Sequence, residues 1–139
     1  MTRAKITAAQ LRRIQKAVGT VPFARLLGIE LDDISSGTAT LGLNIREELT
    51  QNHGVVHGGA IASLIDTATA FAIISILAPR DRVTTVDLTI SYVRPLTDGR
   101  ITAIAKVLRA GRRLFVVSAE VFDKEGKLAT TALSTYIKL

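Results

Sequence analysis

The stretch that most constrains the fold of this chain is residues 60–78, in which Asp66 is the single charged residue. The other residues are apolar or small and polar. Large apolar side chains fall on several sides of a helix, among them Ile61, Leu64, Ile65, Phe71, Ile74 and Ile76. A helix that is apolar around its circumference is buried on most sides. Because Pro79 cannot continue a helix, the sequence predicts a buried helix about 30 Å long that ends there.

A membrane span of this length is an alternative, and two features argue against it. Asp66 lies near the middle of the stretch, and ionisable residues are rare inside spans. The segments that follow alternate between apolar and polar residues, as strands do. We therefore expect no membrane partner and a helix packed against a sheet. Burial of Asp66 costs free energy unless the carboxylate is paired or hydrogen-bonded, so function is one candidate reason for its presence.

The composition is that of one globular domain. With 139 residues, 47% of them hydrophobic, the chain is long enough for a substantial core. We predict a single domain over residues 1–139, with residues 1–21 as an N-terminal helical extension. The absence of cysteine excludes disulfides and thiolate metal sites. Residues 1–15 contain no apolar segment of the signal-peptide type, so the cytoplasm is the expected location.

The net charge of +6 leaves two interpretations open. One is a solvated basic surface, and the other is a local site for an anionic ligand, such as a phosphate-bearing cofactor. Aromatic residues make up only 4% of the chain, and no basic helix or RNA-binding motif is present. No nucleic-acid partner is therefore expected.

The remaining segments predict short helices and then strands. Residues 7–18 read as a helix with a capping box from Thr7 and Gln10, and Pro22 begins a further helical turn. Residues 29–45 read as a hairpin. Four strands are expected after Pro79: 82–93, 101–108, 114–122 and 128–139. Alternation in the first places four side chains on one face: Val86, Leu88, Ile90 and Tyr92. A run of hairpins builds an antiparallel sheet, and one buried helix against it gives an α+β fold.

Candidate chemistry gathers at His57, Gly58 and Gly59, where the long helix begins. The backbone N–H groups there lie at the positive end of the helix and suit a carbonyl oxygen that becomes an oxyanion. Asp66 lies about 12 Å further along the same helix, too far to act on that carbonyl directly. A second subunit that presents its own Asp66 removes this difficulty, so the spacing indicates a dimeric site.

Other interpretations of these residues remain open. The histidine and glycines also fit a helix start that binds nothing, and Asp66 fits a carboxylate bonded to a buried hydroxyl or backbone group. His53 and His57 have the four-residue spacing of zinc ligands on a helix. Gly54 and the loop context break that geometry, and no third ligand is evident. No metal is therefore expected.

Residues 56–72, preceded by the loop of residues 51–54, resemble the signature of the hotdog-fold acyl-CoA thioesterases. The resemblance is to the phenylacetate-pathway type, which is related to the hydroxybenzoyl-CoA thioesterases. It extends from residue 23 to residue 137 and includes residues 84–95 and 111–123. The motif is specific because the His-Gly-Gly triplet, the aspartate nine positions after the histidine and the strand pattern agree.

The resemblance implies a hotdog fold, in which an antiparallel sheet wraps around one long central helix. It implies a homodimer as the minimal unit, with active sites at the subunit interface, and a homotetramer as the assembly. The implied substrate is an acyl-CoA thioester. Coenzyme A is part of this substrate, and no separate cofactor is expected.

The roles of the site residues follow from the resemblance by position. Asp66 matches the catalytic carboxylate, which acts as a general base towards water or as a nucleophile. The N–H of Gly58 polarises the thioester carbonyl. The active-site amide falls on Gln51 or on its neighbour Asn52.

Two further positions and a set of cations complete the expected site. His57 orients the loop or the thioester, and a hydroxyl that positions water falls near Thr85. The phosphates of coenzyme A need cations, for which the sequence offers Arg82, Arg109, Arg112 and Arg113. Two alternative functions remain: a non-catalytic acyl-CoA binder and a hotdog hydratase. A hydratase needs an Asp/His pair in a different loop pattern, and the sequence does not contain that pattern.

Overall fold

The computed structural model describes residues 5–139. Within these residues the chain forms three α-helices, α1 (Ala8–Thr20), α2 (Pro22–Leu27) and α3 (Gly58–Ile74). The strands are β1 (Glu30–Ser35), β2 (Thr38–Asn44), β3 (Val83–Tyr92), β4 (Arg100–Ala110), β5 (Leu114–Phe122) and β6 (Leu128–Lys138). Two short 3₁₀ helices, η1 (Glu47–Leu49) and η2 (Asn52–Gly54), connect β2 to α3.

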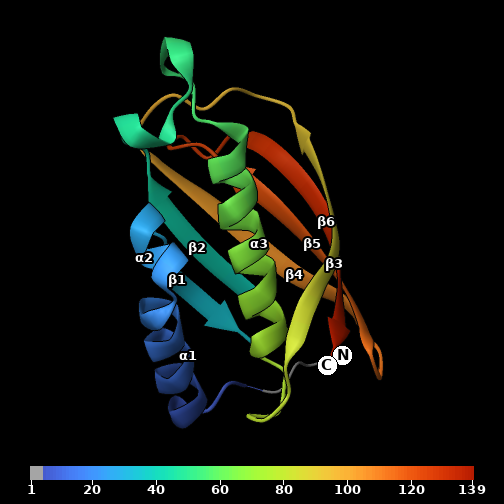
Figure 1. Cartoon of the computed structure of the whole chain (residues 1–139). Coiled ribbons are helices and arrows are strands. Elements are labelled where there is room, and N and C mark those ends of the chain that lie inside the picture. Colours follow the sequence, from blue (N-terminus) through green and yellow to red (C-terminus); the bar gives the residue numbers. More distant parts are fainter. Residues whose placement is uncertain (1–4) are drawn as a thin grey trace.

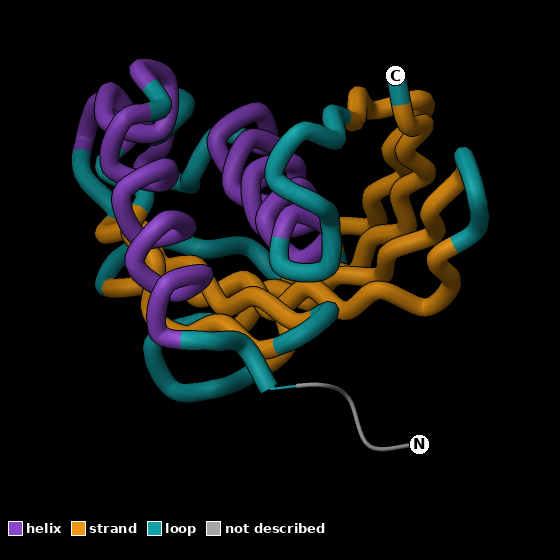
Figure 2. The backbone as a smooth tube through the Cα atoms, turned by 90° about the horizontal axis from the view of Figure 1, so that it is seen from below, coloured by secondary structure: helices purple, strands orange, loops and turns teal. Residues whose placement is uncertain are grey.

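The six strands form one curved sheet with α3 across its concave face (Figures 1 and 2). Neighbouring strands are antiparallel, in the order β1-β2-β4-β5-β6-β3. The predicted α+β hotdog fold, an antiparallel sheet wrapped around one long helix, is confirmed. β1 and β3 are the edge strands, so each has a strand partner on one side only within residues 5–139.

The expectation that consecutive hairpins build the sheet is wrong for β3 and β4. β3 pairs with β6, and β4 pairs with β2. The connection of residues 93–99 crosses the end of the sheet, where the Val93 N–H donates to the Ala129 carbonyl at 2.9 Å and the Ile45 N–H to the Gly99 carbonyl at 2.9 Å. α3 packs against β2, β4 and β5, so the strand that follows it emerges at the far edge.

A β-bulge in β3 changes the predicted alternation of side chains. The pairing register shifts between Thr85 and Asp87, and Val86 is 54% exposed instead of facing the core. Leu88 and Ile90 do pack against the core, as predicted. A bulge inserts one extra residue into a strand. Side chains before the bulge therefore point to the opposite faces from those that unbroken alternation with the later residues predicts. The bulge thus brings Thr85, rather than Val86, to the face covered by α3.

α3 ends at Ile74, four residues before the predicted end. Ser75 stops the helix, because its hydroxyl donates to the Ala72 carbonyl at 2.6 Å and accepts from the Gly37 N–H at 2.7 Å. These bonds tie the end of α3 to the β1–β2 turn before Pro79 is reached. A hydrogen bond between residues 38 positions apart leaves no local sequence pattern, so proline was the only visible stop.

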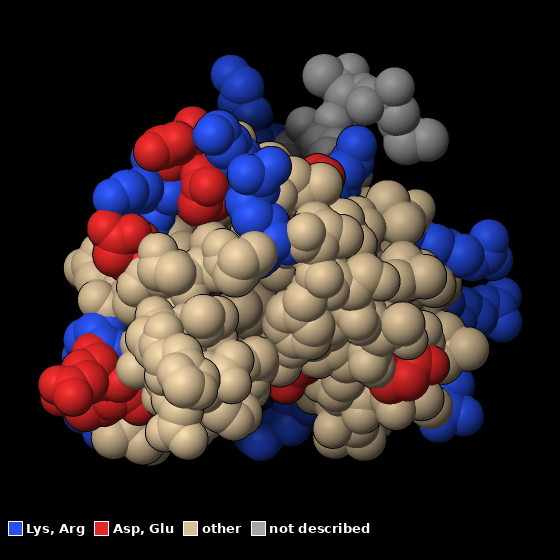
Figure 3. All heavy atoms as spheres, turned by 90° about the horizontal axis from the view of Figure 1, so that it is seen from above, with Lys and Arg blue, Asp and Glu red and all other residues tan. Residues whose placement is uncertain are grey.

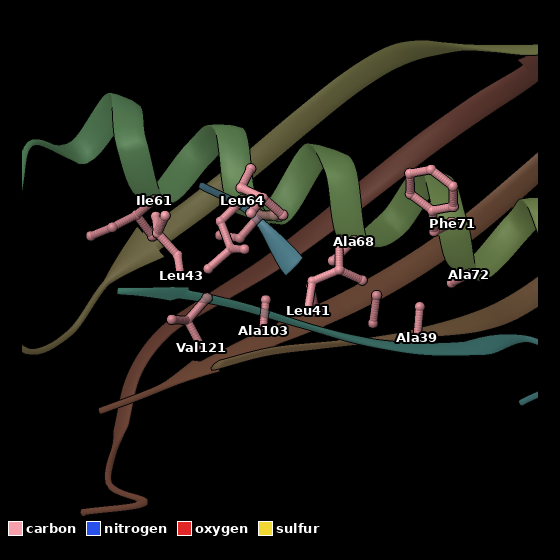
Figure 4. Packing of buried hydrophobic residues seen from close by; sticks show 14 of the residues in the cluster. Ala39, Leu41, Leu43, Ile61, Leu64, Ala68, Phe71, Ala72, Ala103 and Val121 are labelled. Atoms are coloured by element: carbon pink, nitrogen blue, oxygen red, sulfur yellow. The ribbon is translucent and has the colours of Figure 1, made fainter. Parts of the chain in front are cut away.

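The core lies between α3 and the concave face of the sheet (Figure 4). Leu64 of α3 is fully buried, as are Leu41 and Leu43 of β2. Small side chains line the facing positions of the helix and the sheet: Ala68, Ala72, Ala39 and Ala103. The helix can therefore pack closely against the strands, which fixes the position of its two ends relative to β3.

The N-terminal helices lie beside α3 along the β1 edge (Figures 1 and 2). α1 begins with the predicted capping box, in which Thr7 accepts from the Gln10 N–H at 3.1 Å and the Gln10 side chain accepts from the Thr7 N–H at 2.8 Å. Ile14 and Val18 join the main core. Across residues 5–139, every helix is too short or too polar to cross a bilayer.

Candidate active site

Asp66 lies half-buried in the middle of α3, facing β3 and β6. The Thr85 hydroxyl donates a hydrogen bond to Asp66 Oδ1 at 2.9 Å, and the Tyr136 hydroxyl lies 3.0 Å from the same oxygen. In the described part of the chain, Oδ2 has no hydrogen-bond partner. One carboxylate oxygen is therefore held in place, and the other is available to accept a proton or to attack a carbonyl carbon.

Tyr136 is a site residue that the sequence analysis missed. Its hydroxyl lies 2.8 Å from the backbone carbonyl oxygen of Asp66 and 2.8 Å from Thr69 Oγ1. Burial raises the pKa of the Tyr136 phenol far above its ordinary value, because desolvation disfavours the phenolate. The hydroxyl stays protonated and remains a hydrogen-bond donor towards the carboxylate. Strand alternation indicates only that Tyr136 faces inward and gives no signal of this contact.

Gly58 is the first residue of α3, and no hydrogen bond within residues 5–139 engages its N–H. Its carbonyl accepts from the Tyr92 hydroxyl at 2.8 Å. A Cβ at this position would lie 3.3 Å from the Tyr92 ring, so glycine permits this close approach. The free N–H group lies at the positive end of the helix dipole and can donate to a ligand oxygen.

His57 is the N-cap of α3. Its Nδ1 accepts from the Gly59 N–H at 2.8 Å, which leaves the proton of the neutral ring on Nε2. The His57 backbone N–H donates to the Leu49 carbonyl at 2.8 Å. A Cβ at Gly59 would lie 2.9 Å from Nδ1, so the second glycine makes room for the cap. These contacts orient the loop, and a contact between His57 and a thioester stays a prediction.

Gln51 and Gly58 line the same cavity, of about 400 Å³, between the loop before α3 and the β3–β4 connection. Tyr92 and Arg94 also line it, and Arg94 is a cation that the sequence analysis did not select. Asn52 is exposed in η2 and is not part of the lining. Seen from the end of the molecule where α3 begins, charged side chains stand mainly around the rim and the middle is largely uncharged (Figure 3).

Asp66 lines a different cavity, of about 510 Å³, together with Thr85 and Tyr136. We call these three residues the acid half-site, and Gln51, Gly58 and Tyr92 the amide half-site. The two cavities share no lining residue. Asp66 lies eight positions after Gly58 in α3, a rise of about 12 Å. One chain therefore holds the two groups apart, as the spacing in the sequence predicts.

The predicted arginines lie at the end of the sheet nearest the acid half-site. Arg82 lines the cavity of Asp66, and its carbonyl accepts from the Leu139 N–H at 2.8 Å. The neighbouring Lys138 N–H donates to the Arg113 carbonyl at 2.7 Å, which brings the β4–β5 turn to the same end. Four exposed side chains have no ion-pair partner among residues 5–139: Arg82, Arg109, Arg112 and Arg113.

An antiparallel sheet wrapped around one long helix defines the hotdog fold. The model of the thioesterase superfamily matches residues 53–130, which is more than half of the chain. The chain belongs to the thioesterase superfamily.

Individual proteins agree with this assignment. The medium/long-chain acyl-CoA thioesterase YigI of Salmonella typhimurium is 29% identical over 96% of this chain and 97% of its own length. The structure of conserved protein PA5202 from Pseudomonas aeruginosa superposes with a TM-score of 0.84 and 31% identity, covering 92% of this chain and 98% of that one. The E. coli PaaI protein from the phenylacetic acid degradation operon shares the fold, with a TM-score of 0.87 and 24% identity over 96% of each chain. The resemblance to the hotdog thioesterases is thereby confirmed.

Proposed function

We propose that this protein hydrolyses acyl-CoA thioesters at active sites that two subunits share. The observation that carries the proposal is the separation of the acid half-site from the amide half-site. Each lies in its own cavity, one beside Thr85 near the start of β3 and the other beside Tyr92 at its end. The acid half-site offers the carboxylate of Asp66, and the amide half-site offers the N–H of Gly58. Attack on a carbonyl group uses both.

An antiparallel pair of β3 strands supports this arrangement. β3 is an edge strand of ten residues that pairs with β6 on one side and with no strand of residues 5–139 on the other. Such a free edge is a template for another strand. A two-fold axis near the middle of β3 reverses the partner strand. Thr85 of one subunit then lies near Tyr92 of the partner subunit, and the two half-sites combine twice in each homodimer.

Exposed apolar side chains on the convex face of the sheet support a homotetramer built from two such dimers. Four of them are between 39% and 56% exposed: Ile104, Leu108, Leu114 and Leu133. Large apolar side chains exposed on one face of a sheet can form contacts between subunits. Light scattering on the purified protein measures both levels of assembly.

The chemistry of the shared site follows from its donors and its carboxylate. The Gly58 N–H polarises the thioester carbonyl and stabilises the oxyanion, and the Gln51 amide orients the thioester. Asp66 Oδ2 either takes a proton from the attacking water or attacks the carbonyl carbon itself, while Thr85 and Tyr136 hold Oδ1. Breakdown of the tetrahedral intermediate expels the thiolate of coenzyme A. With Asp66 as general base, this step gives the free acid directly; with Asp66 as nucleophile, it leaves a mixed anhydride on the carboxylate, which water then hydrolyses to the free acid. YigI, a relative that aligns over nearly the whole chain, is named an acyl-CoA thioesterase, which supports the substrate class.

The deciding experiment is an assay of thiol release from a panel of acyl-CoA thioesters. We expect saturable turnover with at least one acyl group. Binding of acyl-CoA without turnover would contradict hydrolysis and favour the non-catalytic binder, and hydration of an enoyl-CoA would favour the hydratase.

Tyr136→Phe tests the positioning of Asp66. We expect kcat to fall about tenfold, because a hydrogen bond to the carboxylate is lost, while KM changes less than about twofold because the substrate contacts are retained. Steady-state kinetics measure both constants, and thermal unfolding reports the loss of stability separately. A fall in stability at unchanged kcat would assign Tyr136 to the fold alone.

Arg112→Glu combined with Arg113→Glu tests the proposed phosphate contacts. We expect KM for acyl-CoA to rise about tenfold or more, because each reversal replaces attraction to a phosphate by repulsion. The same acyl group on N-acetylcysteamine has no phosphates, so its KM should stay constant. Reversal of the exposed Arg12 and Lys16 of α1 is the matched control. An equal rise for both thioesters would contradict the assignment.

A further inference from the structure

The peptide that joins Gly58 to Gly59 at the start of α3 is held at both ends by side chains. Its carbonyl oxygen, which belongs to Gly58, accepts from the Tyr92 hydroxyl at 2.8 Å. Its N–H group, which belongs to Gly59, donates to His57 Nδ1 at 2.8 Å. Hydrogen bonds at the two ends of one amide polarise it and strengthen each other. The peptide that directly follows the Gly58 N–H is therefore fixed from β3 at one end and from the N-cap of α3 at the other.

The two glycines explain why this peptide gains from support outside the helix. Glycine reaches more backbone conformations than any other residue, and the first N–H groups of a helix have no partner within it. A donor that stabilises an oxyanion has to point at the place where the oxygen will lie. Restraint of Gly58 by Tyr92 therefore bears on the direction of the Gly58 N–H.

We infer that Tyr92 is a positioning residue for the reaction, and that it acts on the thioester carbonyl through the backbone of Gly58. The inference rests on the proposed function, because it takes the Gly58 N–H as the group that polarises this carbonyl. Tyr92 is the last residue of β3, the strand proposed to pair between subunits. Its hydroxyl therefore ties the carbonyl-binding end of α3 to the strand along which the shared site is proposed to assemble.

A direct contact between the Tyr92 hydroxyl and the thioester is the alternative role, and the existing hydrogen bond argues against it. A phenol has a single proton to donate, and Tyr92 donates it to the Gly58 carbonyl. The pKa of a phenol is about 10, and desolvation raises the pKa of Tyr92 further, so the hydroxyl keeps its proton at neutral pH. A role in the core is also disfavoured, because Tyr92 is 50% exposed.

The C=O stretching frequency of a bound thioester reports how strongly its carbonyl is polarised, so infrared difference spectroscopy tests the inference. The probe is the thioester with the highest turnover in the panel, isotopically labelled at its carbonyl carbon and bound to Asp66→Asn protein, in which hydrolysis is slow. Binding should lower the frequency relative to the free thioester. Addition of Tyr92→Phe should remove most of this lowering, because phenylalanine keeps the ring and loses only the hydroxyl.

Tyr136→Phe in the same Asp66→Asn background is the matched control. The Tyr136 hydroxyl contacts residue 66 and Thr69 and makes no hydrogen bond to Gly58. Its loss should therefore leave the carbonyl frequency unchanged. The two tyrosines are thus expected to separate in this measurement, although both substitutions lower kcat.

Steady-state kinetics of Tyr92→Phe in otherwise wild-type protein give a second readout. We expect kcat to fall about tenfold, because one positioning hydrogen bond is lost. KM should change less than about twofold, because the donor is aimed at the oxyanion and the other substrate contacts are retained. Light scattering at the assay concentration should show the wild-type assembly state.

The possible failures are distinguishable. A bound thioester whose frequency is lowered equally with and without Tyr92→Phe would overturn the inference, and any fall in kcat would then assign Tyr92 to the interface or the fold. No lowering on binding to Asp66→Asn protein would remove the Gly58 N–H as the polarising group, and the inference with it. A wild-type protein that hydrolyses no thioester of the panel would instead contradict the proposed function itself.

Discussion

Asp66→Asn should lower the rate of thiol release from acyl-CoA by about a thousandfold, because a general base or nucleophile contributes on this order. The amide oxygen of asparagine can accept the same bonds that Thr85 and Tyr136 give to Oδ1, so the fold should be retained. The amide nitrogen replaces Oδ2 and can neither take a proton from water nor attack a carbonyl.

Asp33→Asn is the matched control for this prediction. Asp33 is an exposed carboxylate on β1, at the edge of the sheet opposite to β3. Its loss should leave turnover near the wild-type value, and thermal unfolding should confirm that both variants are folded. Full activity of Asp66→Asn would remove the carboxylate from the mechanism and refute the proposed function.

Two inactive variants should restore activity when their subunits are combined. Gly58→Val should be inactive as a pure protein, because the new side chain crowds Tyr92 and covers the N–H that polarises the carbonyl. Asp66→Asn should be inactive because it keeps the Gly58 N–H but lacks the carboxylate. In a mixed dimer, one of the two sites combines the intact Asp66 of one subunit with the intact Gly58 of the partner subunit. Such dimers should have about half of the wild-type turnover.

Mixed dimers are obtained by co-expression with two different affinity tags and purification through both. The matched controls are doubly tagged proteins in which both subunits carry the same substitution, either Asp66→Asn or Gly58→Val. Both controls should stay inactive. If the mixed protein has the same assembly state as the wild-type protein by light scattering and is still inactive, Asp66 and Gly58 do not combine across subunits. A site within one chain would then have to be sought.

The half-sites show which parts of a function local sequence reveals. The helix start at Gly58 and the lone carboxylate at Asp66 were predicted because a short motif and a helical period both lie within consecutive residues. Their spacing of eight positions also predicted two distinct locations in one chain, since helix geometry fixes the rise between them.

Thr85 and Tyr136 show where that reasoning stops. The resemblance pointed to a hydroxyl near Thr85, but alternation alone placed Val86 and not Thr85 on the inner face, and the bulge reversed this order. Tyr136 is 70 residues from Asp66, and nothing near it in the chain indicates the contact. The position of β3 at the sheet edge was missed for the same reason, because strand order depends on where α3 packs.

The sequence by itself determined the long apolar helix, its glycine start, its single acid and the strands that follow. Each of these depends on neighbours within a few residues, where backbone geometry is nearly fixed. Only the tertiary structure decided which hydroxyls hold the acid and which strands lie at the edges of the sheet. These depend on contacts between distant segments, whose geometry is set by the packing of α3 against the whole sheet.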